Sequence, residues 1–416
     1  MNVRSIVVLN DFCHVQGGAS RVAIDEAVAL ATLGFDVTFI GAVGPVCEEL
    51  QSASIKVLCL DQPELADASR HPAVTLQALW NRTACRIVWC GLATLDPYRT
   101  VVHLHGYTKA LSAAPAVVAR RAGFPVICTL HDFFAACPNG AFYDYQRQLP
   151  CPLRALSVAC MLTRCDKRHQ LHKAYRVARA LAQRSLALFP SSVHNYITLS
   201  RRTAELLRPY LPASARLHEL PNVISASHAP PVNVASNQPM VVVGRLDAEK
   251  GVDMAAQACR AVGLPVAFVG DGPLRRDLEA TGARVTGWLS AEQVVQELAR
   301  ARCLLFPSLW YETYGLVVTE AAARGVPAIV SDVTAPAERI IDGVDGWTFR
   351  SGDLTSLMRQ LRLTRDDGVV RAAGGAAYRR YWQAPSDPRT HALALVAIYD
   401  KVLAADIPKS DCAKAA

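Results

Sequence analysis

The chain has 416 residues and a mass of 45.0 kDa, which is too long for one ordinary core and predicts two or three domains. Hydrophobic residues make up 51% and charged residues 19%, which excludes a disordered polymer because such a chain buries enough apolar surface to offset its ordering entropy. The 44 Lys and Arg residues exceed the 36 Asp and Glu residues, and the net charge of +8 favours anionic partners such as phosphates, nucleic acid or an acidic membrane surface.

The opening stretch MNVRSIVVLNDF is typical of a first strand, because its apolar run is too short for a signal peptide. Apolar runs elsewhere fall short of the roughly 18 to 20 residues that a membrane-spanning helix needs. We therefore expect a cytoplasmic protein in which most of the 13 cysteines are reduced thiols.

The first half alternates short apolar runs with amphipathic segments, as parallel strands and crossover helices do. Strands are predicted at Ser5–Leu9, Asp36–Ile40, Ile55–Leu60, Val101–His105, Val126–Leu130 and Leu186–Pro190. Gly17 and Gly18 follow the first strand and precede a helix expected near Ala19. Glycine lets the backbone approach a ligand closely, although such a pair more often marks only a turn.

Two of these strands end in histidine. VVHLHGY carries His103 and His105, and VICTLHDFF carries His131 followed by Asp132. A strand-end histidine is usually structural, but two such strands ending at one crevice make His131 a candidate catalytic residue.

A cysteine-rich insert, residues 137–165, follows directly on His131. Its four cysteines are Cys137, Cys151, Cys160 and Cys165. A structural zinc site, disulfides and unlinked thiols all remain open, because the spacing lacks the paired C-x2-C motif of a strong zinc prediction.

The segment from Arg164 to Arg184 is basic, with seven Lys or Arg residues and one acidic residue, Asp166. It is either a solvated helix face or a surface attracted to anionic lipid headgroups. Nucleic-acid binding is not expected, because no recognition motif accompanies it.

The stretch SASHAPPVNVASNQP, residues 225–239, is rich in Ser, Pro and Asn and is predicted to be a linker. Beyond it the α/β alternation is clearer, with helices expected to begin near Gly251, Leu274, Ala291, Gly315 and Ala335. After Asp353 the pattern is helical, and the last residues, KSDCAKAA, look frayed. Strands are predicted at Met240–Gly244, Val266–Gly270, Arg284–Trp288, Cys303–Pro307 and Ala328–Ser331.

The segment VVVGRLDAEKGVD places Arg245 and Lys250 after a strand, where two cations would neutralise a diphosphate leaving group. The alternative is a surface salt bridge with Asp247 and Glu249. VGDGPL at 269–274 forms a third, weaker strand-end turn.

The strongest motif is LLFPSLWYETYGLVVTEAAARGVPAIVSD. Glu312 lies in a loop, and Glu320 lies in a helix opened by Gly315. Over eight helical residues the glutamates would be about 12 Å apart, near the span of a nucleotide diphosphate sugar. The amides of Gly315, Leu316 and Val317 would form a diphosphate cradle at the helix N-terminus. Alternatively, both glutamates are merely solvated.

Together, GRLDAEKG, VGDGP, the E-x7-E pair, the GG loop and LHD resemble the family 4 retaining glycosyltransferases over nearly the whole chain. The resemblance implies an α/β protein of the GT-B fold, in which two Rossmann-like domains face each other across a cleft. It implies an acceptor-side domain at 1–224, a linker at 225–239, a nucleotide-sugar domain at 240–385, and at 386–416 a helix returning to the first domain plus a frayed tail.

By the same resemblance, Arg245 and Lys250 would bind donor phosphates, Glu320 the ribose hydroxyls and Glu312 the transferred sugar. His131 would hydrogen-bond the donor sugar near the reacting carbon. The amides of Gly315 to Val317 would meet the diphosphate or sugar, and Gly17 and Gly18 would approach the donor phosphates or the acceptor.

The implied function is transfer, without a metal or other cofactor, of a sugar from a UDP- or GDP-sugar to a saccharide or lipid-linked acceptor. Polysaccharide or glycoconjugate synthesis at the inner face of the cytoplasmic membrane would be its setting. The alternatives are a nucleotide-sugar epimerase or sugar-phosphate synthase on the same fold, and a catalytically silent glycan-assembly protein.

Overall fold

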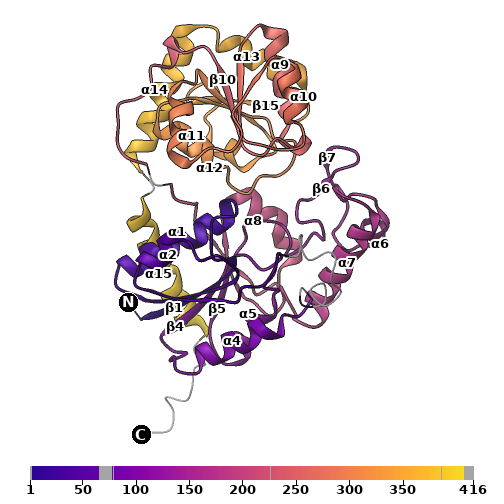
Figure 1. Ribbon diagram of the computed structural model, residues 1–416, viewed down its shortest axis with the longest axis vertical. Coiled ribbons are helices and arrows are strands. Elements are labelled where there is room, and N and C mark those ends of the chain that lie inside the picture. The colour runs from indigo at the N-terminus through magenta and orange to yellow at the C-terminus, as the bar shows by residue number, and fades with distance from the viewer. Residues whose placement is uncertain (1, 65–76, 78, 225, 386, 407–416) are drawn as a thin grey trace.

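The computed structural model describes residues 2–64, 77, 79–224, 226–385 and 387–406. Two β-sheets, each flanked by helices, occupy the lower and upper halves of Figure 1. Every strand pair within these two sheets is parallel, as the alternating pattern of the sequence predicts.

The first sheet has the strand order β3-β2-β1-β4-β5-β8-β9. Alternate residues of β1 enter separate cores on its two faces, Val7 and Leu9 on one and Ile6 and Val8 on the other. The strands are β1 (Ser5–Phe12), β2 (Asp36–Val43), β3 (Ile55–Cys59), β4 (Thr100–Leu104), β5 (Val126–Thr129), β8 (Asn195–Thr198) and β9 (Arg216–Glu219). The helices of this half are α1 (Gly18–Thr32), α2 (Glu48–Ser52), α4 (Arg82–Leu92), α5 (Ala114–Arg121), α8 (Arg201–Leu207) and η1 (Arg208–Tyr210).

The cysteine-rich insert and the basic segment form a lobe at the edge of this half (Figure 1), and Cys137, Phe142 and Ala155 of this lobe share a core with Val7 and Leu9 of β1. It consists of a two-stranded antiparallel sheet and two helices. These elements are β6 (Tyr143–Asp144), β7 (Leu149–Pro150), α6 (Val158–Leu162) and α7 (Gln170–Ser185).

The second sheet has the order β12-β11-β10-β13-β14-β15. Its strands are β10 (Met240–Val243), β11 (Val266–Val269), β12 (Arg284–Val285), β13 (Cys303–Phe306), β14 (Ala328–Ser331) and β15 (Gly346–Phe349). The elements around it are η2 (Val234–Ser236), η3 (Ala248–Lys250), α9 (Val252–Val262), α10 (Arg275–Ala280), α11 (Ala291–Ala299), α12 (Leu316–Ala323), η4 (Ala335–Arg339), α13 (Leu354–Leu363) and α14 (Asp367–Gln383).

Several element predictions were wrong. The strand expected at Leu186–Pro190 does not form, because α7 continues to Ser185 and the following leucines, Leu186 and Leu188, are exposed rather than buried in a sheet. The strand expected at Arg284–Trp288 stops at Val285, since Gly287 has a positive φ and Trp288 is 69% exposed. The helix expected at Ala335 is a short 3-10 helix.

The last helix, α15 (Pro388–Asp406), returns to the first half of the molecule and lies beside α1 (Figure 1). Its side chains Leu395, Val396 and Tyr399 join the same buried core as Ile24 and Ala27 of α1. This return brings residues nearly 400 positions apart into contact: the Asp400 carboxylate accepts from the Asn2 amide at 2.7 Å. The terminal residues expected to fray lie outside the described residues.

The connection between the two halves is packed onto the second half. Arg302, which is 6% exposed, donates from Nη1 to the carbonyl oxygens of Ala235 at 3.2 Å and Asn237 at 3.1 Å. Val234 is buried in a core of the second half. The Asn237 side chain also donates to the carbonyl oxygens of Ala299 and Ala301, both at 3.0 Å, so this Ser-, Pro- and Asn-rich segment is held on the second half by several contacts.

Candidate functional site

A cavity of about 300 Å³ lies between the two halves, at the carboxyl ends of their strands. The first half contributes Gly18, after β1, and His131, after β5. The second half contributes Lys250 and Glu312, which follow β10 and β13. Four segments that the sequence singled out therefore line one space, together with Gly315, Leu316 and Val317.

Lys250 and Glu312 form an ion pair inside this cavity. The Glu312 carboxylate also accepts from Ser308 Oγ at 2.9 Å and from Trp310 Nε1 at 2.6 Å. The Lys250 ammonium lies 5.3 Å from the centroid of the Trp310 ring, within range of a cation–π interaction. The carboxylate and the ammonium are thus fixed in place by each other and by the loop that follows β13.

Glycine at position 251 allows this approach. Gly251 has φ of +65°, and a side-chain carbon there would overlap the carbonyl oxygen of Pro307, at the end of β13. Only a residue without a Cβ lets the loop after β10 lie so close to the loop after β13.

The N-terminus of α12 faces the same cavity. Gly315 is its N-cap residue with φ of 74°, and no side chain caps the first turn. The first amides of the helix are therefore left without a helical acceptor and, with the helix dipole, can bind an anion.

His131 connects the two halves. Its carbonyl oxygen accepts from Thr313 Oγ1 of the second half at 3.0 Å, and its Nε2 lies 2.9 Å from His105 Nδ1. Burial lowers the pKa of His131 to about 4, so its imidazole is neutral at neutral pH.

Behind His131 lies a buried network that the sequence did not reveal. His105 Nε2 is 3.1 Å from His103 Nδ1 and 3.5 Å from a carboxylate oxygen of Glu26, whose other oxygen is 2.9 Å from His391 Nε2. Within the described part of the chain, Glu26, His103 and His105 are the one group whose ligand atoms lie close enough to hold a metal ion. Neither Glu26 nor His391 belongs to a sequence motif. The sequence could not predict their contact, because only the return of α15 to the first half brings them together.

Arg245 has a different placement from Lys250. Its guanidinium contacts Asp247 at 2.5 Å and Glu249 at 3.7 Å, and Lys167 of the insert lobe contacts the same two carboxylates at 2.8 and 2.9 Å. The salt-bridge alternative therefore describes Arg245, which lines a neighbouring cavity.

Glu320 and Gly17 lie outside the residues that line the 300 Å³ cavity. Glu320 is on α12, and burial raises its pKa while Arg21 of α1 lowers it. Glu312 lies in the loop before α12, as expected, so the rise of a helix does not set its distance from Glu320. Gly17 has φ of 116° and is the N-cap residue of α1. A side-chain carbon added at Gly18, the first residue of α1, would lie 3.8 Å from Leu316 across the cavity.

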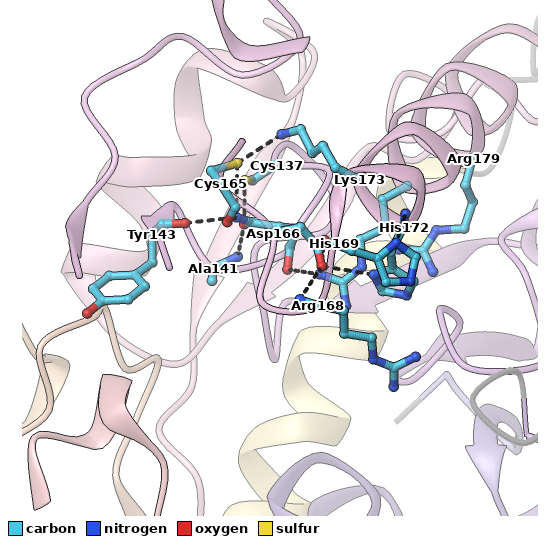
Figure 2. A network of polar contacts seen from close by, with 12 residues as sticks. Cys137, Ala141, Tyr143, Cys165, Asp166, Arg168, His169, His172, Lys173 and Arg179 are labelled. Carbon is cyan, nitrogen blue, oxygen red and sulfur yellow. Dashed lines mark hydrogen bonds and ion pairs between the residues drawn. The ribbon is translucent and has the colours of Figure 1, made fainter. Parts of the chain in front are cut away.

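The cysteines of the insert are free thiols, like every cysteine in the described residues. Figure 2 shows the Lys173 ammonium reaching Cys165 Sγ, at 3.0 Å, and Cys160 Sγ is 3.9 Å from the same nitrogen. Cys137 Sγ donates to Asn139 Oδ1 at 3.0 Å, and burial raises the pKa of this thiol to about 11. No three of the insert's sulfur atoms, all within the described chain, lie within 4.8 Å of one another.

The basic segment does not form one solvated face. Lys173 and Arg179 are 3% and 6% exposed, and Arg176 pairs with Asp166 at 3.2 Å. Asp166 also accepts from the Arg168 amide and lies 3.0 Å from His172 Nδ1 (Figure 2). Two of the seven cations, Lys173 and Arg179, are thus part of the lobe's interior rather than its surface.

Comparison with protein families matches both halves. Residues 17–223 match a model described as "Glycosyl transferase 4-like domain", and residues 238–367 match one described as "Glycosyl transferases group 1".

Among curated proteins, an exopolysaccharide phosphotransferase of Streptomyces coelicolor, SCO2592, is 33% identical over 208 residues, which are 46% of this chain and 22% of that protein. Glycogen synthase of Mycobacterium tuberculosis is 29% identical over 216 residues, 47% of this chain and 51% of that protein. The chain thus spans about a fifth to a half of the length of these relatives.

Among solved structures, sucrose-phosphate synthase from Thermosynechococcus elongatus superposes with a TM-score of 0.68 at 17% identity, covering 97% of this chain and 100% of that one. Anabaena HepE, solved in complex with UDP and glucose, superposes with a TM-score of 0.63 at 15% identity, covering 96% and 100%. These likenesses confirm the predicted GT-B fold.

Proposed function

Because the chain belongs to the family 4 glycosyltransferases of the GT-B fold, we propose that it moves a sugar from a nucleotide diphosphate sugar to a saccharide or lipid-linked acceptor, with retention of configuration. We place this reaction in polysaccharide or glycoconjugate synthesis. The observation that carries the proposal is the convergence of Lys250, Glu312, His131 and the first amides of α12 on one interdomain cavity.

The chemistry of the leaving group supports these roles. Departure of a nucleoside diphosphate builds negative charge, and a cation with preorganised amides stabilises that charge more in the transition state than in the ground state. Lys250 and the amides of Leu316 and Val317 lie where they can do this without a metal ion. Arg245 would have to exchange its contacts with Asp247 and Glu249 for the phosphate.

Glu312 and His131 would hold the transferred sugar. Glu312 is a carboxylate fixed by three donors, so its remaining acceptor capacity can orient sugar hydroxyls. The neutral imidazole of His131 offers a hydrogen bond without placing a charge beside the reacting carbon. Glu320 would bind the ribose hydroxyls.

The donor is a UDP- or GDP-sugar, and the complexes of HepE with UDP and with UDP-glucose support the first. A thermal-shift screen against UDP-, GDP- and ADP-sugars tests this, because a ligand at 100 times its dissociation constant stabilises a protein by about 2.7 kcal/mol. Absence of a shift with every nucleotide sugar would contradict the proposal.

Donor consumption with and without acceptor tests the reaction itself. Transfer requires both substrates. An epimerase or a sugar-phosphate synthase would release product without a saccharide acceptor, and a silent assembly protein would bind the donor without consuming it.

We also propose that the protein works in the cytoplasm and contacts the inner face of the membrane peripherally. Among the described helices, none is long and apolar enough to span a bilayer. The insert lobe exposes Val158, Leu162 and Leu171, at 67%, 79% and 79%, next to Arg164 and Arg168. Apolar side chains beside basic ones are the combination that binds anionic lipid surfaces.

Sedimentation with anionic vesicles at low salt tests this contact. The wild type should sediment with the vesicles, and the double variant Leu162→Ser, Leu171→Ser should remain in the supernatant. Equal recovery of both proteins in the supernatant would contradict membrane binding.

A further inference from the structure

A second cavity, of about 560 Å³, lies beside the first, between the insert lobe and the second half. The walls of the two cavities are linked at two places by neighbouring residues. Asp132 lines the second cavity and follows His131 directly, and Trp310 lines it while donating to Glu312 in the first. A molecule in the second cavity would therefore lie next to the sugar end of a donor held in the first.

Arg179 of α7 is an unusual wall of this cavity, because it is a buried cation with no carboxylate within ion-pair distance in the described chain. The acidic group that acts on it from farther away is Asp132, which lines the same cavity. It is 6% exposed, and its Nη1 donates to the carbonyl oxygen of Thr108 at 2.8 Å. Its Nε is buried without a hydrogen-bond partner, and its guanidinium lies 4.8 Å from the Phe134 ring centroid. Within the described chain, Arg179 takes part in no ion pair with a carboxylate. A buried charge is costly unless it is paired.

Tyr175 presents a second unsatisfied group to the same cavity. It lies four residues before Arg179 on α7, which places both side chains on one helix face. Its hydroxyl is also buried without a hydrogen-bond partner. Two residues that line the cavity thus each hold a buried polar atom that has no hydrogen-bond partner in the described chain.

The other walls suit a charged saccharide. Six Lys or Arg residues line the cavity against two carboxylates, Asp132 and Glu249. Lys167 and Arg245 are already paired with Asp247 and Glu249, so Arg179 is the buried cation that remains available. Tyr145 and Trp310, with ring centroids 6.5 Å apart, add flat apolar surface of the kind on which sugar rings pack.

We propose that the second cavity binds the acceptor and that the acceptor carries an anionic group, phosphate or carboxylate, which Arg179 and Tyr175 recognise. This inference rests on the proposed sugar transfer and names the acceptor's chemical class. The planar guanidinium binds two oxygens of such a group at once, which a neutral sugar cannot match. Asn139, Gly140 and Tyr145 of the insert line the same cavity, so the insert would contribute to acceptor choice.

The experiment uses the full chain and three matched acceptors: an alkyl hexoside, its 6-phosphate, and the corresponding alkyl hexuronide. We expect kcat/KM for one or both charged acceptors to exceed that for the neutral one by about 10- to 100-fold, the value of a charge-assisted hydrogen-bonded pair. The charged acceptor with the larger preference identifies the anionic group. Arg179→Met should remove this preference by lowering kcat/KM for the charged acceptors far more than for the neutral one.

Arg184→Met is the matched control, because Arg184 is on the same helix but is not among the residues that line the cavity. It should keep the preference. Arg179→Lys keeps the charge without the planar fork and should retain only part of it. Binding of UDP, measured by calorimetry, should be the same in all these variants.

A wild type that prefers the neutral acceptor would overturn the inference whatever the variants do. An Arg179→Met variant that loses activity equally with all three acceptors would also overturn it, because Arg179 would then only tie α7 to the Thr108 loop.

Calorimetry of the sugar phosphate and the uronide with UDP-saturated wild type and Arg179→Met needs no turnover. Weaker binding to the variant supports the anion site, and equal binding overturns it, even if no transfer is found. Absence of transfer with every donor and acceptor would contradict the proposed function separately.

Discussion

Lys250 and Glu312, 62 residues apart in the chain, are ion-pair partners at the interdomain cavity. Lys250 is half-buried at the end of η3, and Glu312 lies in the loop before α12. The pair couples the loop after β10 to the loop after β13, so a change at either residue alters the position of the other.

Lys250→Met should lower the rate of sugar transfer by about 10²- to 10³-fold, the usual loss when one charge-stabilising donor is removed. Steady-state kinetics with a saturating donor measures this, and circular dichroism checks that the fold survives. Lys56→Met is the control, because Lys56 is an exposed lysine on β3 outside the cavity. Near-normal turnover of the Lys250 variant would remove the residue from the mechanism.

Arg245→Met separates a phosphate ligand from a structural salt bridge. If Arg245 leaves Asp247 to bind the donor, the variant should lose transfer by orders of magnitude while its melting temperature changes little. A lower melting temperature with unchanged kcat/KM would show that the contacts with Asp247 and Glu249 are its main role.

Glu320→Ala should weaken binding of the nucleotide sugar by about 10- to 100-fold, which is the usual value of hydrogen bonds to a carboxylate. The effect on the transfer step should be smaller. Because burial raises the pKa of Glu320, wild-type donor affinity should also begin to fall at a higher pH than an ordinary glutamate would allow. Calorimetry with the nucleoside diphosphate measures both effects, and an unchanged dissociation constant would exclude the ribose role.

His131 should make stability depend on pH. Its pKa falls from 6.5 in the unfolded chain to about 4 in the folded protein, so the unfolded state binds more protons between these values. The contribution of the neutral His131 to the free energy of unfolding is complete above pH 6.5. It is lost as the pH falls toward 4, and the loss is at most about 3 kcal/mol.

Asp132 changes the free energy of unfolding in the opposite direction, because burial raises its folded pKa to about 6. The folded state therefore gains stability from this group as the pH falls below 6. The measurement is therefore the difference between wild type and His131→Gln, obtained from urea unfolding between pH 4 and 7. The variant should lose less stability on acidification. Parallel pH profiles would contradict a buried neutral His131.

Thiol alkylation should follow exposure. Cys90 is exposed, whereas Cys137 is buried with its pKa raised to about 11. At a given pH, raising the pKa of a thiol from 9.0 to about 11 cuts its thiolate fraction by about 100-fold, so iodoacetamide should label Cys90 well before Cys137. Mass spectrometry of the labelled peptides follows both sites. One zinc ion per chain in elemental analysis, with labelling of Cys137 only after chelation, would instead establish the zinc alternative.

The sequence by itself determined the two parallel sheets and most of the strand ends that carry the site. Apolar runs such as VVVG and LLFP bury strands on both faces, and parallel strands send their carboxyl ends to one edge. For that reason the sequence alone predicts one shared site for His131, Lys250, Glu312 and the start of α12. The strand at 216–219, RLHE, escaped prediction because its central residues are not an apolar run.

Only the tertiary structure decided which charges face each other. Whether a cation pairs with a neighbour in sequence, as Arg245 does with Asp247, or with a distant residue, as Lys250 does with Glu312, depends on how close two loops approach. The burial of Arg179 without a carboxylate and the contact of Glu26 with His391 of α15 likewise depend on helix packing. Local patterns report which face of a strand or helix is apolar, and they do not report which distant polar group will lie opposite.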